Sequence, residues 1–153
     1  MEIKNEKSTE KKNITSSLAF STKKWYFLDL TDKTLGRIAP LVVAILRGKN
    51  KRNFLANADM GDCVILTNTE KVNITGNLDK KHYYNYSGYP GGMRKRSTRT
   101  MLEEYPVELT QRVIKGMMPH NKLGSKQLKR LFVYRGSEHS QQAQEKHFIN
   151  IKI

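Results

Sequence analysis

Cysteine and metal-binding patterns are nearly absent from this sequence. Its single cysteine, Cys63, cannot form an internal disulfide, and its four histidines stand at none of the spacings typical of metal ligands; they are His82, His120, His139 and His147. We therefore expect a reducing compartment, no structural zinc and no cofactor. Cys63 lies within an apolar run, so we expect its thiol to be buried and unreactive.

Long apolar runs are absent as well. The longest, residues 41–46, belongs to an amphipathic segment and is far shorter than the roughly 18 residues that a membrane span requires. Residues 1–24 contain six lysines and three glutamates but no apolar stretch of the kind found in secretory signals. We expect a flexible basic arm over 1–24, one domain over 25–145 and an extended polar tail over 146–153.

The sequence also lacks recognised catalytic motifs. Gly88, Gly91 and Gly92 fit neither the phosphate-binding loop nor the dinucleotide-binding pattern. Glu138 and His139 place an acid beside an imidazole, but no motif sets a serine or cysteine nucleophile next to them. We therefore expect that the protein is not an enzyme. An enzyme acting on RNA would instead lose turnover when either of these two side chains is replaced by alanine.

What the sequence has in excess is positive charge. Lysine and arginine number 28 against 14 acidic residues, which gives a formal net charge of +14 and a pI near 9.9. Between residues 80 and 135, thirteen basic residues stand against three acidic ones. Such a chain repels itself until a polyanion neutralises it, and nucleic acid, an anionic membrane and an acidic protein are the possible partners. Any one lysine could belong to a solvated face, but the whole pattern favours nucleic acid.

Aromatic rings alternate with these cations in residues 77–100. The stretch contains His82, Tyr83, Tyr84, Tyr86 and Tyr89, followed by Arg94, Lys95, Arg96 and Arg99. Rings can stack on unpaired bases, and the chain has neither a helix-turn-helix pattern nor zinc-finger spacing, so RNA is favoured over duplex DNA. Tyr83 and Tyr84 are adjacent and lie on opposite faces of any strand; we expect one to pack inward and the other to face outward.

Apolar periodicity predicts an α/β or mixed layered domain. Strands are expected at 25–30, 63–66, 72–74 and 132–134, with the second and third joined by a short turn. Helices are expected from residue 34 to a cap at Gly48, around 101–102, across 107–117 after Pro106, and in a short segment that closes at 131. Pro119 and Gly124 are expected to punctuate a loop, and Pro40 is expected near the first turn of its helix.

Read in order, seven groups of residues between about 24 and 145 resemble the large-subunit ribosomal protein thirteen family, of bacterial and organellar type. The groups are Trp25-Tyr26 with Asp29; Leu35-Gly36-Arg37 with Leu46-Arg47-Gly48-Lys49; Asp59-Met60-Gly61-Asp62; Lys71-Val72 with Thr75-Gly76; Tyr83-Tyr84 with Ser87-Gly88-Tyr89-Pro90-Gly91-Gly92; Lys115-Gly116-Met117-Met118-Pro119 with Leu123-Gly124; and Val133-Tyr134 with Gly136, Glu138-His139 and Ala143-Gln144.

The resemblance implies a fold, a partner and a place in the cell. The fold would be a three-layer α/β/α domain with a small mixed sheet of about four strands. The partners would be large-subunit ribosomal RNA, which the protein binds and organises during early subunit assembly, and neighbouring large-subunit proteins. The protein would be a monomer within the ribosome, in the bacterial cytoplasm or in an organelle. An RNA-binding regulator or assembly factor outside the ribosome is the alternative that the charge pattern leaves open.

The resemblance and the charge pattern together select the residues expected to bind RNA. The resemblance implies Arg47, Lys49, Lys51, Lys81, His82, Tyr83, Tyr84, Gly91, Gly92, Lys115, His120, Lys122 and Gly124. The charge pattern adds Arg52, Arg94, Lys95, Arg96, Lys126, Arg130 and Arg135. The chain departs from the family pattern at several positions, among them Asn57, Tyr86, Ser125 and Gln141.

Overall fold

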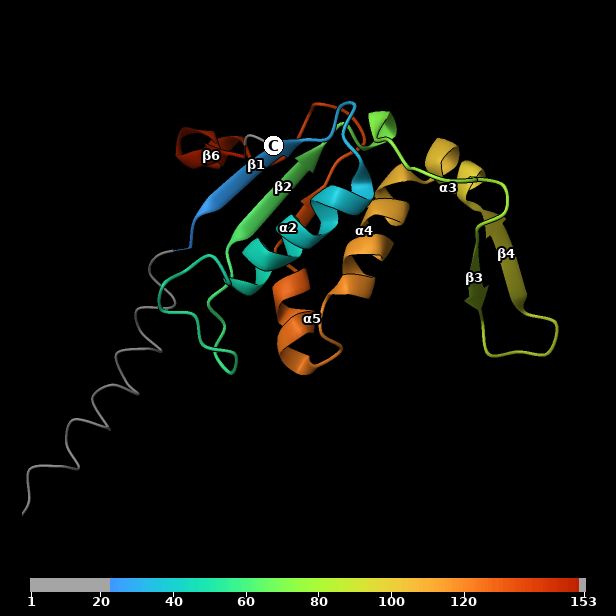
Figure 1. Ribbon diagram of the computed structural model, residues 1–153, viewed down its shortest axis with the longest axis horizontal. Coiled ribbons are helices and arrows are strands. Elements are labelled where there is room, and N and C mark those ends of the chain that lie inside the picture. The colour runs from blue at the N-terminus through green and yellow to red at the C-terminus, as the bar shows by residue number, and fades with distance from the viewer. Residues whose placement is uncertain (1–22, 152–153) are drawn as a thin grey trace, which may run out of the picture.

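The computed structural model describes residues 23–151, so the predicted arm over 1–24 lies almost entirely outside the described residues. Within this range the elements follow one another as β1 (Trp25–Asp29), α2 (Leu35–Arg47), β2 (Cys63–Thr67), η1 (Thr69–Lys71), β3 (His82–Tyr86), β4 (Met93–Ser97), α3 (Thr98–Glu104), α4 (Pro106–Met117), α5 (Lys122–Leu128), β5 (Leu131–Val133), η2 (Gln142–His147) and β6 (Phe148–Asn150). The expected α/β class is confirmed, and Figure 1 shows the arrangement of these elements.

The central sheet has four strands in the order β5-β2-β1-β6, and all three pairings are parallel. Parallel neighbours need a crossover connection, and α2 supplies it between β1 and β2. The strand β2 lies inside the sheet and is buried along its whole length, which fits its unbroken apolar sequence. The antiparallel pairing that the expected mixed sheet would have included forms separately, between β3 and β4.

The main hydrophobic core lies between one face of the sheet and the helices. Leu28, Val64 and Leu66 from the strands pack in one cluster with side chains of α2 and with Ile114 of α4. The helix α2 contributes seven buried residues because its apolar side chains recur at helical spacing. Figure 1 shows α2, α4 and α5 lying together across the sheet.

The other face of the sheet carries an aromatic cluster. The rings of Trp25 and Phe132 stack with centroids 5.7 Å apart, and those of Phe27 and Phe148 stack at 5.6 Å. His139, from the segment after β5, packs against Phe27 and Phe148. Rings from the strands and from the segment after β5 thus pack together on this face.

The first predicted helix agrees with the structure at its end but not in the place of its proline. Gly48 adopts a left-handed conformation with φ of 78°, and the backbone N–H groups of Gly48 and Lys49 donate to the carbonyls of Ile45 and Ala44. Pro40 lies in the second turn of α2 rather than in the first. Because proline has no N–H, the carbonyl four residues earlier lacks its helical donor, but this part of the helix surface is exposed and water can satisfy that carbonyl.

Three other expectations are corrected by the structure. The strand expected at 72–74 is reduced to an isolated bridge between Thr34 and Asn73, because the chain turns through η1 directly after β2. Gly124 lies inside α5 and not in a loop. The expected tail contains β6, which pairs with β1 from Trp25↔Phe148 onward and forms an edge of the sheet.

The strands β3 and β4 form a hairpin that projects from the body of the domain (Figure 1). Its turn contains Gly88 and Gly91, both with positive φ, which explains the glycines in this part of the sequence. At its base, the backbone N–H and the hydroxyl of Thr98 both donate to the carbonyl of Lys81 at 3.0 Å. Thr98 therefore anchors the base of the hairpin.

Candidate nucleic-acid interface

Apart from Arg135, the exposed residues expected to bind RNA fall on three separate surfaces. The first, called the α2 loop, contains Arg47, Lys49 and Arg52; the second is the β3–β4 hairpin with Lys81, Arg94 and Lys95; the third, called the α5 surface, contains Lys115, His120, Lys122 and Lys126. Figure 1 shows the loop after α2, the loop into α5 and the tip of the hairpin along the same lower edge of the view. The fold thus directs segments far apart in sequence toward one side.

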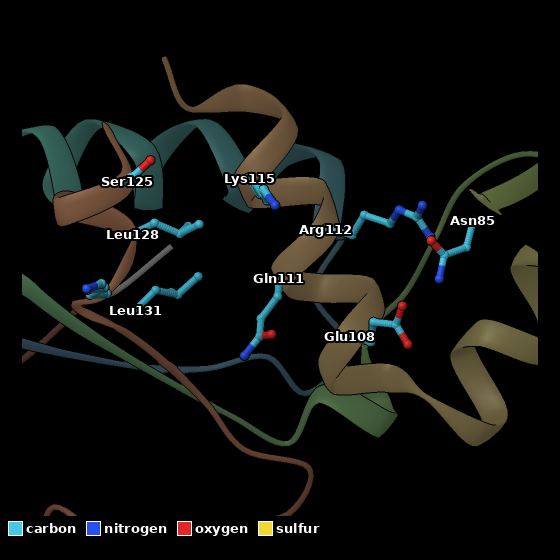
Figure 2. A pocket seen from close by; sticks show the side chains of 9 residues that line it. Asn85, Glu108, Gln111, Arg112, Lys115, Ser125, Leu128 and Leu131 are labelled. Carbon is cyan, nitrogen blue, oxygen red and sulfur yellow. The ribbon is translucent and has the colours of Figure 1, made fainter. Parts of the chain in front are cut away.

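A cleft of about 660 Å³ lies between α4, α5 and the hairpin (Figure 2). Leu128 and Leu131 point into it from one side, and α4 supplies Gln111, Arg112 and Lys115 from the other. Lys129 also lines the cleft, so three cations stand there against the single acid Glu108. The cleft is therefore a positively charged depression with an apolar floor.

Arg112 connects the cleft to the hairpin. Its Nη2 donates a 2.5 Å hydrogen bond to the carbonyl oxygen of Tyr84, and its guanidinium lies over the ring of Tyr83 at 5.4 Å from the centroid. The Nζ of Lys81 lies 5.8 Å from the same centroid. Tyr83 therefore faces α4 while Tyr84 is 55% exposed, which confirms the prediction that the two rings point opposite ways.

A second contact between the hairpin and α4 involves Arg96. Its guanidinium lies 4.5 Å from the ring centroid of Tyr105, and its Nη1 lies 3.5 Å from Oε2 of Glu108. Arg94 and Lys95, its neighbours on β4, are exposed, and neither forms an ion pair within residues 23–151. The basic triplet thus divides into one cation that positions the hairpin and two that face solvent.

Other predicted RNA ligands have partners inside the protein. Lys51 pairs with Asp62, and Arg130 pairs with Asp59 and donates to the carbonyl of Gly61 at 2.9 Å. Arg135, which is exposed, lies 3.3 Å from Glu70. The acidic partners of Lys51 and Arg130 are buried (Asp62) or partly buried (Asp59), whereas Arg135 and its partner are both exposed. The structure gives Lys51 and Arg130 roles in holding the fold together.

The predicted glycines also differ in what they do. Gly124 is buried, and a side-chain Cβ there would lie 2.0 Å from the carbonyl oxygen of Pro119, so glycine is required for packing. The side chain of Asn121 caps α5, because its Oδ1 accepts a 2.6 Å hydrogen bond from the N–H of Gly124. Gly91 shapes the hairpin turn, and a Cβ at Gly92 would lie 2.1 Å from Oγ of Ser87. These glycines set the backbone geometry of the hairpin turn and of α5.

The four positions that depart from the family pattern lie in different environments. Asn57 and Tyr86 are exposed, Ser125 lines the cleft, and Gln141 accepts a 2.5 Å hydrogen bond from the Tyr134 hydroxyl. Of these, Ser125 and Tyr86 lie within the candidate interface, in the cleft and on the hairpin.

Of the three cations that line the cleft, sequence reasoning predicted Lys115 as an RNA-binding residue and missed Arg112 and Lys129. A signal for the first was present, because Arg112 and Lys115 stand three residues apart and thus on one face of a helix. Lys129 follows α5 directly, and its place in the cleft depends on how α5 packs against α4. That packing cannot be predicted from the residues around Lys129 alone.

The alternative catalytic pair is separated by the fold. His139 is packed among rings with a side chain only 10% exposed, and its Nε2 lies 3.6 Å from Oε1 of Glu145. Glu138 is exposed and forms no ion pair with it. Over residues 23–151 there is no group of three metal-ligating side chains, and none of the helices there is long and apolar enough to cross a membrane.

Burial shifts the pKa of two side chains in the central sheet, Cys63 and Tyr26. Burial raises the pKa of the Cys63 thiol and outweighs the opposite effect of the nearby Arg130 guanidinium; Cys63 is 8% exposed. Burial also raises the pKa of the Tyr26 phenol. The prediction of a buried thiol at Cys63 is therefore confirmed, and neither group carries charge near neutral pH.

Comparison with known proteins shows which family the chain resembles. The sequence profile of ribosomal protein L13 matches residues 23–140. The large ribosomal subunit protein uL13 of Mycoplasmopsis synoviae (strain 53) is 50% identical over 133 residues, which cover 86% of this chain and 92% of that protein. The proteins of the same name from Mesomycoplasma hyopneumoniae (strain 232) and Geobacillus sp. (strain WCH70) are 48% and 49% identical, over 84% and 80% of this chain and 90% and 86% of their own lengths.

Proposed function

This chain belongs to the ribosomal protein L13 family, and we propose from this premise that its unpaired cations hold large-subunit ribosomal RNA in a fixed geometry. It is a structural constituent of the large ribosomal subunit, as the names of its relatives state for those proteins. The relatives named above are bacterial proteins, and we infer that this protein is part of ribosomes in the bacterial cytoplasm. The proposal therefore concerns which of its surfaces contact RNA.

The observation that carries the proposal is the division between paired and unpaired cations. Lys51, Arg96 and Arg130 are neutralised within the protein. A second group is exposed and forms no ion pair in the described residues; it consists of Lys49, Arg52, Arg94, Lys95, Lys115, Lys122 and Lys126. These cations repel one another unless phosphates neutralise them, and RNA that binds them releases its counterions.

The cleft supports a more specific role for α4 and α5. An RNA backbone that crosses it would meet Lys115 and Lys129 on opposite walls, while Arg112 is held in place by Tyr83 and the Tyr84 carbonyl. A preordered guanidinium loses little conformational freedom when a phosphate binds. We assign phosphates to the rim of this cleft and to the α2 loop, and we assign neighbouring ribosomal proteins to surfaces outside them.

We further infer that the protein catalyses no reaction. Its family is a structural one, and the His139 ring is packed among Phe27, Tyr134 and Phe148 rather than set beside a nucleophile. A role early in subunit assembly fits an interface that needs only RNA, because the unpaired cations require no second protein to complete them.

The test is the affinity of the purified full chain for a protein-free large-subunit ribosomal RNA transcript, measured at several salt concentrations. The proposal expects tight binding whose logarithm falls steeply with the logarithm of salt concentration. A matched pair of double variants locates the effect: Lys115→Ala with Lys122→Ala removes two unpaired cations, whereas Arg135→Ala with Arg99→Ala removes two that have acidic partners. Equal loss in both pairs, or salt-insensitive binding, overturns the proposal.

A further inference from the structure

The β3–β4 hairpin has two faces of different chemistry. Tyr83 pairs with Arg96 across the strands, and both contact α4 or its neighbour Tyr105. Side chains alternate along a strand, so Tyr84 and Tyr86 of β3 lie on the opposite face with their cross-strand partners Lys95 and Met93. This second set, Tyr84, Tyr86, Met93 and Lys95, is called the outward face.

The outward face exposes an unusual amount of apolar surface. Tyr84 is 55% exposed, and Tyr86 and Met93 are each 61% exposed. The core cluster of the domain includes none of them, and the hairpin is held by Thr98, Arg96 and Arg112 through its base and its other face. Contiguous exposed apolar residues that the fold does not need mark an interaction surface.

Charge and shape indicate what covers this face. Between residues 80 and 102 the chain contains no aspartate or glutamate, and exposed Lys95 lies opposite Tyr84 on the same face. A basic border favours a polyanion over a protein surface, which would have to be strongly acidic. Flat rings beside cations are the arrangement that binds unpaired nucleic acid, because each base has a face for stacking and each nucleotide a phosphate.

We propose that the outward face stacks unpaired bases of large-subunit ribosomal RNA on Tyr84 and Tyr86, with Lys95 at the adjoining phosphate. This inference rests on the proposed function and divides the interface by RNA structure. The α2 loop and the cleft bind backbone by charge, whereas the outward face selects a single-stranded segment. A duplex cannot bind there in the same way because its bases are already stacked on one another.

The experiment compares two probes, a 12-nucleotide oligouridylate and a 12-base-pair RNA duplex, with the full chain at one low salt concentration. In the variant Tyr84→Leu with Tyr86→Leu, which keeps apolar side chains but removes the rings, affinity for the oligouridylate should fall by about fivefold to a hundredfold for each ring that stacks. Affinity for the duplex and the salt slope of both probes should not change, since no charge is removed. The variant Tyr84→Phe with Tyr86→Phe keeps the rings and should bind like the unaltered protein.

Several outcomes would overturn the inference. Unchanged oligouridylate binding by the leucine variant rejects stacking, and the proposed function survives if Lys115→Ala with Lys122→Ala still weakens binding. If the leucine variant binds both probes normally but fails to join large subunits, the partner of this face is a protein. That result also rejects the inference. Thermal unfolding checks that the leucine variant is folded; if it is not, Tyr86→Leu alone, at the end of β3 far from the hairpin base, serves as the test.

Discussion

The Nζ of Lys51 donates a 2.6 Å hydrogen bond to Oδ1 of Asp62, whose side chain is only 4% exposed. The same carboxylate oxygen accepts the backbone N–H of Lys24 at 3.0 Å. One buried acid therefore fastens the α2 loop and the start of β1 to the start of β2. Lys51, which the resemblance assigns to RNA, is thus also the counter-ion of this acid.

The first prediction follows from that pairing. Replacing Lys51 with alanine leaves a nearly buried carboxylate without its cation, and we expect the free energy of unfolding to fall by about 1–3 kcal/mol, less than for a fully buried pair because Lys51 is partly exposed. Lys49→Ala, two residues away on the exposed surface, should change it by less than about 0.5 kcal/mol. Urea denaturation of both variants makes the comparison, and equal stabilities would contradict the assignment.

The second prediction concerns the basic triplet of β4. Arg94→Ala with Lys95→Ala should weaken binding to the large-subunit transcript and reduce the salt slope by about two, because each of the two cations neutralises one phosphate. Arg96→Ala should reduce the slope less than a single unpaired cation does, because its charge already faces Glu108. Filter binding over a salt series measures the slopes. Equal slopes per charge removed would show that all three arginine and lysine side chains bind phosphate.

The third prediction uses two glycines with opposite surroundings. Gly124→Ala brings a methyl group against the Pro119 carbonyl and should lower the free energy of unfolding by about 1–3 kcal/mol. A methyl group on Gly116, in α4, would meet no heavy atom within 4 Å outside the helix backbone, so Gly116→Ala should raise stability by about 0.5–1 kcal/mol. Thermal unfolding separates the two. If both changes stabilised the protein, the tight packing of α5 against residue 119 would be wrong.

The fourth prediction is a pH dependence at Cys63. Burial raises the pKa of this thiol above its value in the unfolded chain, so the neutral form that the fold favours contributes fully below the unfolded pKa. That contribution should be lost as pH rises from the unfolded value through the higher folded one. The difference in unfolding free energy between the unaltered protein and Cys63→Ala should therefore shrink above about pH 8.5 and stay constant below it. A difference that grows at alkaline pH would reverse the sign.

Some of this structure can be predicted from sequence because the signal is local. The helix α2 has apolar residues at helical spacing and a glycine at its end, and β2 has an unbroken apolar run. The strand β6 has no such signal, since Phe148–Asn150 is three residues long and its partner β1 lies at the other end of the described chain. Only long-range pairing makes this segment a strand.

The candidate interface divides in the same way. Composition predicts that the surface is basic, but it cannot separate Lys49, which is exposed, from Lys51, which meets Asp62 only after the loop has folded. The outward face of the hairpin depends on strand register, which places Tyr84 opposite Lys95 and Tyr86 opposite Met93. Residue types can be read from the sequence, whereas the fold decides which of them have partners.

The most direct test of RNA binding by the unpaired cations is acetylation of lysines in purified large subunits, read by mass spectrometry and compared with the free protein. We predict that Lys49, Lys95 and Lys122 react in the free protein and are protected in the subunit. Lys71 and Lys146, which are exposed on η1 and η2, should differ less in acetylation between the free protein and the subunit than these three lysines do. Full reactivity of the first three lysines in the intact subunit would contradict the claim that unpaired cations bind the RNA.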